Sequence, residues 1–300
     1  MSSLPNDRAV RAAVSVAAEY GLRCTEPVVL GRMSNVLVHL APHPVVARVA
    51  GIMGDLRDGA ADWLAREVAV VRHLGGRGAV TVSRLPPGPH LCDGLALTFV
   101  ALERPDPAAV LDPAETGMSL RRLHEGLRGL ELELPRLGLL DECATWWDRL
   151  SPDADLSEET LARLRDRHAE VRAAVDGLES ADQVLHGDAH AGNVMATPRG
   201  LVWTDFEDVT AGPPLWDLAC LAARARVLGE GEGGYGPEWA DAAIRAYGAD
   251  PRDPRLDLLV TARTLVVAAW ALSAGAERTR LRAAGLDRVR WLLTEGSGAA

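Results

Sequence analysis

A short segment in the second half of the chain gathers side chains that could carry out phosphoryl transfer. Asp188 and Asn193 lie in the motif H-G-D-x4-N, and Asp205 follows in the segment W-x-D-F-E. Transfer from a magnesium nucleotide needs one carboxylate that orients or deprotonates the attacking hydroxyl. It also needs a second carboxylate and an amide oxygen for the metal, since Mg²⁺ prefers hard oxygen ligands. We expect short flanking strands to bring the three side chains into one small volume.

The region before this segment has mostly strand-like patterns. Two β-branched runs, 36–40 and 45–49, flank a proline-rich turn and predict a hairpin. Apolar residues at helical spacing predict a helix over 60–74, which Gly75 and Gly76 end. The other elements predicted here are a helix over 7–20 and strands over 27–30, 80–85 and 95–102.

Helical periodicity dominates after Glu103. Ser157 followed by acidic residues predicts a helix start, and further helices are expected over 215–228 and within 237–293. The sequence therefore predicts an α+β, bilobal fold, with a small β-rich lobe over residues 1–103 and a larger α-helical lobe over residues 104–300.

Composition excludes several classes of function. The chain has 300 residues and a net charge of −10, which disfavours nucleic acid and anionic membrane surfaces as partners. It contains no lysine, so Schiff-base chemistry and a Walker-A phosphate loop are excluded. The cysteines form no C-x-x-C pair, the N-terminus shows no apolar leader, and the apolar run 264–276 is too short to cross a bilayer. We expect a cytoplasmic protein without nucleic-acid or membrane partners.

The two motifs and the segment G-P-P-x-x-D-L-A that follows them resemble the aminoglycoside phosphotransferase and choline kinase family of small-molecule kinases. The resemblance extends over most of the chain. Leu30-Gly31-x3-Asn35 is similar to the family's phosphate-covering loop, and Glu67 stands where the family has an acid on a helix. The resemblance implies a protein-kinase-like fold, with nucleotide binding in the N-terminal lobe and catalysis in the C-terminal lobe.

The resemblance also implies a role for each matching residue. Asp188 would be the catalytic aspartate of a kinase that uses ATP or GTP. Asn193 and Asp205 would hold Mg²⁺, and Ser34 and Asn35 would belong to the loop over the phosphates.

Two further residues are expected to have structural roles. Asp217 would cap the following helix and brace the loop that carries the H-G-D-x4-N motif, residues 186–193, which we call the catalytic loop. His124 is expected to be a buried, hydrogen-bonded histidine. His186 and His190 at i, i+4 could instead be zinc ligands of a metal-dependent phosphoesterase, although no second His/Asp cluster accompanies them.

At one position the sequence departs from the family. Arg48 occupies the place of the phosphate-pairing lysine, and its guanidinium can still pair with phosphate and with Glu67. Arginine also occurs here on the choline-kinase side of the family. The competing interpretation is a surface ion pair. Because the loop also carries only Gly31, a catalytically silent, nucleotide-binding pseudokinase-like module is the alternative function.

Charge guides the prediction of the acceptor. Residues 141–182 contain twelve acidic residues against five arginines. In the resembling family this region frames the acceptor, so the acids would suit a cationic small molecule such as an aminoglycoside, whose modification gives antibiotic resistance, or a choline-like amine. Alternatively, the acids lie on solvated helical faces. Trp146 and Trp147 could line the acceptor pocket or pack in the core. The protein is expected to be a monomer or a homodimer.

Overall fold

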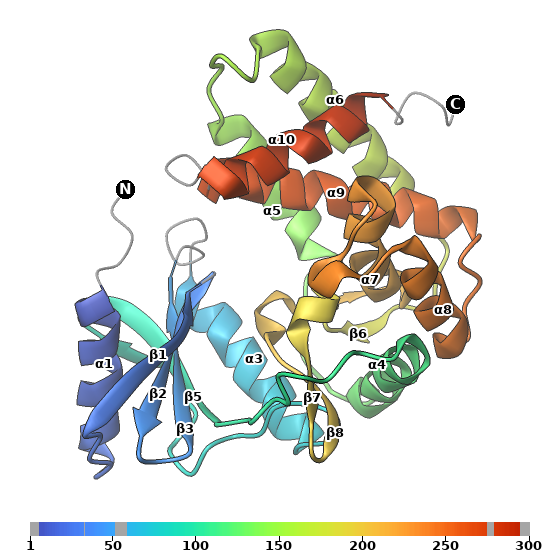
Figure 1. Cartoon of the computed structure of the whole chain (residues 1–300). Coiled ribbons are helices and arrows are strands. Elements are labelled where there is room, and N and C mark those ends of the chain that lie inside the picture. Colours follow the sequence, from blue (N-terminus) through green and yellow to red (C-terminus); the bar gives the residue numbers. More distant parts are fainter. Residues whose placement is uncertain (1–5, 33, 52–58, 275–278, 295–300) are drawn as a thin grey trace. The chain divides into compact units, whose positions relative to one another are not determined.

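The computed structural model describes residues 6–32, 34–51, 59–274 and 279–294. The chain divides into two compact units, of which the first comprises residues 1–109 and 195–208 and the second residues 110–194 and 209–300. The first unit is β-rich and the second is mostly helical, so the chain has the predicted α+β fold with two parts (Figure 1). The predicted boundary between residues 103 and 104 stays a prediction.

A five-stranded antiparallel sheet forms the centre of the first unit, in the order β1-β2-β3-β5-β4. Helix α1 and helix α3 accompany it, and Gly75 ends α3 as predicted, with its N–H bonded to the Val71 carbonyl. The elements are α1 (Asn6–Glu19), β1 (Glu26–Arg32), β2 (Asn35–Ala41), β3 (Val45–Ala50), α3 (Ala60–Leu74), β4 (His90–Cys92) and β5 (Leu95–Ala101).

The predicted strand over 80–85 is wrong, and β4 was not predicted. Within this segment Val82 makes an isolated bridge to Val100, and the preceding residue, Ala79, makes one to Trp203, so no ladder with a single partner forms. The N–H of Val80 accordingly donates to the carbonyl of Trp203, while the carbonyl of Thr81 accepts from the N–H of Ala101. The other predicted strands and helices of this unit are found within one to a few residues of their expected ends.

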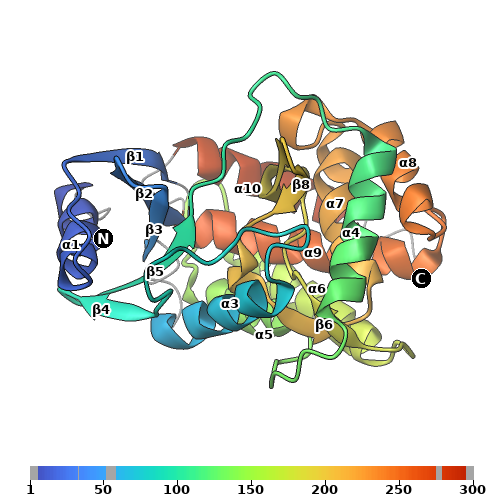
Figure 2. The same cartoon turned by 90° about the horizontal axis from the view of Figure 1, so that it is seen from below.

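Successive side chains of β3 point to opposite faces of the sheet, so one face packs in the core and the other carries Arg48. Val45, Ala47 and Val49 belong to the same buried core as the apolar side chains of α1. Arg48 therefore faces the other side of the sheet, where α3 lies. Figures 1 and 2 show α1 and α3 on opposite sides of these strands.

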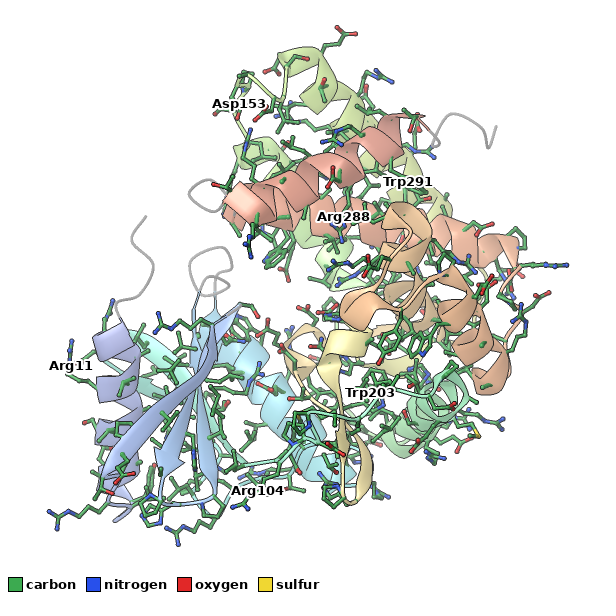
Figure 3. The ribbon with its side chains drawn as sticks, in the orientation of Figure 1. Arg11, Arg104, Asp153, Trp203, Arg288 and Trp291 are labelled. Atoms are coloured by element: carbon green, nitrogen blue, oxygen red, sulfur yellow. The ribbon has the colours of Figure 1, made fainter. Side chains whose placement is uncertain are left out.

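A hairpin from the middle of the chain completes the first unit. It consists of β7 (Val194–Thr197) and β8 (Gly200–Trp203), followed by the short 3-10 helix η2 (Phe206–Asp208), which packs against α3. Arg199 at its turn pairs with Glu103 at 2.6 Å and donates to the carbonyls of Gly76 and Ala79. Trp203 of this hairpin, labelled in Figure 3, is fully buried. The hairpin thereby carries Asp205 to the α3 side of the sheet.

The second unit is a helical assembly around α9 (Pro254–Ala274), which packs against four other helices (Figure 1). Ser157 caps α6 as predicted, because its hydroxyl accepts the N–H of Thr160. A two-stranded ladder of β6 (Gln183–Leu185) and β9 (Thr210–Gly212) and the 3-10 turn η1 (Ala191–Asn193) frame the catalytic loop. The remaining helices are α4 (Pro113–Leu127), α5 (Gly138–Arg149), α6 (Glu158–Asp176), α7 (Leu215–Leu228), α8 (Pro237–Tyr247) and α10 (Thr279–Thr294), with η3 (Glu232–Gly234) between α7 and α8.

Helix α9 is long and apolar enough to cross a membrane, with a mean hydropathy of 1.5. Most of its residues are buried inside the second unit, which is the usual setting of an apolar core helix. The apolar run 264–276 begins in α9, and its last two residues lie outside the described part of the chain.

Candidate active site

In the first unit, Arg48 is surrounded by three carboxylates. Its Nε lies 3.1 Å from Oε1 of Glu67, and its Nη2 lies 2.7 Å from Oδ1 of Asp205 and 3.3 Å from Oε2 of Glu207. The Nδ2 of Asn35 donates a short hydrogen bond to the same Oε2 of Glu207. We refer to these five residues as the Arg48 cluster.

Burial makes the charges of the Arg48 cluster strongly interdependent. The side chain of Arg48 is 5% exposed and those of Glu67 and Glu207 are buried, whereas that of Asp205 is 24% exposed. Burial alone would lower the pKa of Arg48, but Asp205, Glu67 and Glu207 raise it above its ordinary value. Burial raises the pKa of Glu67, and burial together with Asp205 raises the pKa of Glu207. The interpretation of Arg48 and Glu67 as a surface ion pair is therefore wrong.

The charge of the Arg48 cluster fits a divalent cation. Three carboxylates against one guanidinium give a formal charge of −2 when all are ionised. Asp205, the partly exposed carboxylate, has a left-handed backbone with φ of 68°, a conformation that is uncommon for non-glycine residues and occurs at turns as well as at functional sites. In the described part of the chain, no three His, Cys, Asp or Glu side chains are grouped to hold a metal. A single partly exposed carboxylate such as Asp205 can serve Mg²⁺, which proteins usually bind through one or two carboxylates together with phosphate and water.

The two residues predicted for the phosphate loop lie at the start of β2. Asn35 is buried and directed to Glu207, so its side chain ties the start of β2 to the segment that carries Asp205. Ser34 lies at the bend before β2, and a Cβ on Gly51 would come within 2.6 Å of its carbonyl oxygen. The role of Ser34 over the phosphates stays a prediction.

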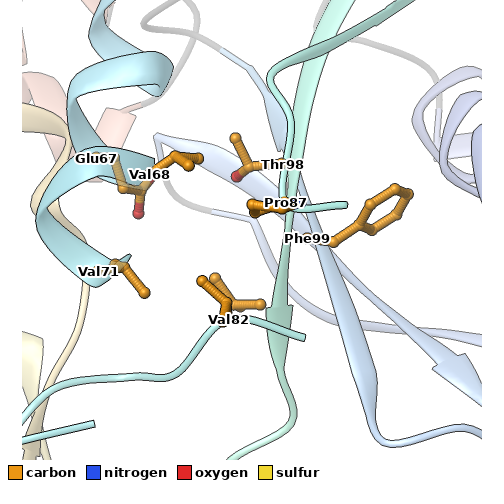
Figure 4. Close-up of a pocket in the computed structure, with 8 residues that line it drawn as sticks. Glu67, Val68, Val71, Val82, Pro87, Thr98 and Phe99 are labelled. Carbon is orange, nitrogen blue, oxygen red and sulfur yellow. The ribbon is translucent and has the colours of Figure 1, made fainter. Parts of the chain in front are cut away.

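Figure 4 shows a small pocket beside the Arg48 cluster, between α3 and β5. Thr98 and Glu67 bring polar atoms to it, and Phe99 points to the opposite side of β5. The other lining residues are apolar, so Thr98 and Glu67 are the side chains of this pocket that could orient a ligand by hydrogen bonds.

In the second unit, the catalytic loop brings Asp188 and Asn193 into contact. The Nδ2 of Asn193 donates to the carbonyl oxygen of Asp188 at 2.9 Å and to its Oδ2 at 3.3 Å. The amide oxygen of Asn193 is thereby left as the atom of this side chain that could bind a metal ion. His186 and His190 serve the loop itself, since their Nδ1 atoms accept from the N–H groups of Asp188 and Gly192.

Side chains from three helices, two of them buried, hold this loop. Asp217 in the first turn of α7 accepts the N–H groups of His186 at 2.8 Å and Gly187 at 2.9 Å. Its Oδ2 also lies 2.8 Å from Nε2 of His124, whose Nδ1 lies 2.7 Å from the hydroxyl of Tyr247. The prediction that Asp217 braces the loop is confirmed, and so is the buried, hydrogen-bonded state of His124. The expected helix cap is wrong, because Pro214 occupies the cap position of α7.

Arg263 of α9 contacts Asp188, the residue predicted to be the catalytic aspartate. Its Nη2 donates to Oδ1 of Asp188, and both side chains are largely buried. Burial raises the pKa of Asp188, but Arg263, His190 and His186 together hold it well below its usual range. Asp188 is therefore an ionised carboxylate that is weakly basic.

Two residues of the site were missed in the sequence. Glu207 stands two positions after Asp205 inside the W-x-D-F-E segment, so its position was a usable signal. Arg263 is the only charged residue between positions 258 and 274, and an isolated charge in an apolar helix is a signal of the same kind.

The structure brings together Arg48, Glu67, Asn35 and Asp205 in one unit and Asp188 and Asn193 in the other. The expectation that Asp188, Asn193 and Asp205 share one small volume joins residues of both units and stays a prediction.

The acids expected to frame a cationic acceptor are largely paired with arginines. Three arginines each bind two acids of this region at 2.6–3.5 Å. Figure 3 labels one of these acids, Asp153, in the loop between α5 and α6. Trp146 and Trp147 are buried in the core, so the packing interpretation holds for both. The pairs are Arg165 with Asp148 and Glu158, Arg172 with Asp141 and Asp176, and Arg282 with Asp153 and Asp155.

Comparison with known proteins gives a family and a fold. The model of the phosphotransferase enzyme family matches residues 28–259. A choline/ethanolamine kinase family protein from Mesorhizobium loti is 18% identical, with 95% of this chain and 98% of that chain covered and a TM-score of 0.59. APH(2″)-IIia, solved with GDP and kanamycin, is 14% identical, with 94% and 97% covered and a TM-score of 0.65. Amicoumacin kinase hAmiN, solved with AMP-PNP, Ca²⁺ and Ami, is 13% identical, with 91% and 93% covered and a TM-score of 0.64. No curated protein matches the sequence.

Proposed function

Because the chain belongs to the phosphotransferase enzyme family, we propose that it transfers the γ-phosphoryl group of a magnesium nucleotide, ATP or GTP, to a hydroxyl group of a small molecule. The observation that carries this proposal is the contact between Asp188 and Asn193 in a loop whose backbone Asp217 clamps. A hydroxyl-orienting carboxylate and a metal-binding amide are thus held together before any ligand arrives, as positioning catalysis requires.

In the proposed reaction, the acceptor oxygen forms a bond to the γ-phosphorus while the bond to the bridging β,γ oxygen breaks, and the nucleoside diphosphate leaves. Asp188 orients the hydroxyl, and its low pKa suits it to receive the proton late, when the oxygen has become acidic. Arg48, fixed by Glu67, would contact the nucleotide phosphates.

Asp205 and Asn193 are the residues that would hold the magnesium ion. Bound there, the ion would neutralise charge on the β- and γ-phosphates. The negative formal charge of the Arg48 cluster and the outward position of Asp205 support this assignment.

A second candidate is the catalytically silent, nucleotide-binding module, which the arginine at position 48 motivates. Its guanidinium is already engaged by three carboxylates, which competes with phosphate binding. The retained Asp188, Asn193 and Asp205 favour the enzyme, because a silent module has no need of a catalytic aspartate and two metal ligands.

The test combines two measurements on the full chain. Magnesium-dependent thermal stabilisation by ATP or GTP reports nucleotide binding, and mass spectrometry of a panel of hydroxyl compounds reports the gain of a phosphoryl group. Stabilisation with transfer supports the proposal. Stabilisation with neither transfer nor nucleotide hydrolysis supports the silent module.

The finer assignments belong to this proposal as well. A cytoplasmic monomer or homodimer that modifies a cationic antibiotic or a choline-like amine fits the family relationship. Since the acids of residues 141–182 are largely paired with arginines, their charge gives little reason to prefer a cation.

A further inference from the structure

The charge carried by helix α9 needs an explanation other than packing. Arg263 is a buried residue of α9, and most of the other buried residues of this helix are apolar. Helix α9 packs against α5, α6, α7 and α10. A buried guanidinium is unfavourable unless a charged partner satisfies it. The partner is the carboxylate of Asp188, the residue that is proposed to meet the acceptor. The arginine therefore belongs to the chemistry of the loop.

The carboxylate of Asp188 is surrounded by groups that donate hydrogen bonds or carry positive charge. Arg263 contacts Oδ1, while Nδ2 of Asn193 lies 3.3 Å and Nε2 of His190 3.6 Å from Oδ2. The side chain of Asp188 is still 19% exposed and that of Arg263 10%. An acceptor that reaches Asp188 thus arrives beside Arg263 and His190.

The carboxylates of this unit are used in other contacts. Asp217, the acid that braces the loop, accepts two backbone N–H groups and contacts His124. The acids of α5 and α6 and of the loop between them pair with Arg165, Arg172 and Arg282. An ammonium group on the acceptor would meet the positive charge of Arg263 beside Asp188, whereas an anionic group would gain a partner there.

We propose that Arg263 is a specificity-determining residue, and that the acceptor carries a carboxylate or phosphate group close to the hydroxyl that receives the phosphoryl group. The planar guanidinium can keep one N–H on Asp188 and offer another to an oxyanion, which is the geometry that arginine uses for carboxylates and phosphates. This inference rests on the proposed function, since it concerns the acceptor of the same reaction. It predicts the opposite charge preference from that of a cationic acceptor.

The test uses four compounds that share a three-carbon skeleton with hydroxyl groups: glycerate, glycerol phosphate, glycerol and aminopropanediol. Their binding to the full chain, in the presence of a magnesium nucleotide, is measured by ligand-observed NMR titration. We expect an anionic compound to bind at least about tenfold tighter than glycerol and aminopropanediol, the gain typical of a charge-assisted hydrogen bond. The first two compounds decide between a carboxylate and a phosphate.

Substitutions test whether Arg263 is the source of the preference for an anionic compound. Arg263→Gln should remove it, with binding of the anion weakened about tenfold and that of glycerol little changed. Arg165→Gln is the matched control, because it removes the same charge from a partly exposed arginine of the same unit and should keep the preference. Thermal stability and nucleotide binding of each variant check the fold, and Arg263→Lys, which keeps the charge, should retain part of the preference.

Several outcomes overturn the inference: equal binding of all four compounds, tighter binding of aminopropanediol, or a preference that survives in Arg263→Gln. If Arg263→Gln does not fold, the inference is judged by whether the unaltered protein binds the anionic compounds more tightly. Phosphoryl transfer measured in the same samples separates the two proposals. Transfer to aminopropanediol but not to the anions would keep the proposed function and overturn the role of Arg263. Anion preference without transfer to any acceptor would count against the proposed function only.

Discussion

The two units of the chain each hold a cluster of predicted site residues, and the two clusters have opposite arrangements of charge. In the Arg48 cluster, one cation is enclosed by three carboxylates. In the catalytic loop, the carboxylate of Asp188 is enclosed by an arginine, a histidine and an amide. The first arrangement leaves an excess of negative charge that suits a metal ion. The second holds a carboxylate ionised and fixed, which suits orientation of a hydroxyl.

The largest expected effect comes from reducing the negative charge of the Arg48 cluster. Asp205→Ala should abolish magnesium-dependent nucleotide stabilisation and lower transfer by about a thousandfold or more, because the phosphates lose their metal ligand. The fold should survive, since Arg48 keeps Glu67 and Glu207 as partners. Calorimetric titration of the nucleotide with and without Mg²⁺ checks the result. Glu19→Ala, at an exposed site of the same unit, is the control, and a variant at Asp205 with near-normal turnover would show that the metal site is misplaced.

The second prediction removes charge from the catalytic loop without removing size. Asp188→Asn can still contact the acceptor but cannot take its proton at neutral pH, so transfer should fall by about 10²–10⁴ while nucleotide affinity changes little. Single-turnover kinetics and nucleotide titration give the two quantities. Thermal denaturation serves as a check, because the variant also deprives the buried Arg263 of its charged partner. A loss confined to nucleotide affinity would contradict the assignment of this loop.

The third prediction breaks the Arg48 cluster at its cation. Arg48→Ala leaves buried carboxylates unpaired and should lower the free energy of unfolding by about 3–5 kcal/mol, with weaker nucleotide binding. Arg48→Lys should lose less stability, since a charge remains, yet it cannot contact Glu67 and Asp205 with a planar fork. Chemical denaturation and nucleotide titration measure both effects, with Arg11→Ala at an exposed site of α1 as control. Unchanged stability in Arg48→Ala would mean that the ion pairs add nothing to the fold.

The parts of the site that the sequence predicted are those where neighbouring positions carry the information. Asp188, Asn193 and Asp205 stand in short motifs, and the helix of Glu67 has a clear apolar period and a glycine stop. Alternation along β3 puts Arg48 on the opposite face from the core, a consequence of strand geometry.

What the sequence did not predict depends on contacts between distant segments. The segment 80–85 has the composition of a strand, but its backbone divides its hydrogen bonds between Trp203 and Ala101, far along the chain. Arg263 reaches Asp188 across 75 positions, and the acids of α5 and α6 find arginines that neutralise them. Pairings of this kind are set by tertiary packing, which no local pattern encodes.

The smallest expected effect concerns the brace behind the catalytic loop, which is built from hydrogen bonds rather than from paired charges. Burial raises the pKa of Tyr247 to about 12, so its hydroxyl stays protonated, 2.7 Å from Nδ1 of His124. Because the carboxylate of Asp217 can only accept, Nε2 of His124 carries the proton that faces it, and in a neutral imidazole Nδ1 is then the acceptor for the Tyr247 hydroxyl. Tyr247→Phe keeps the ring and removes only this donor, so the free energy of unfolding should fall by about 0.5–1.5 kcal/mol. Because Asp217 still holds the backbone of His186 and Gly187, the transfer rate should fall by less than about tenfold. Denaturant titration and steady-state rates measure the two effects, and a loss of transfer as large as that of Asp188→Asn would show that the hydroxyl of Tyr247 takes part in the reaction itself.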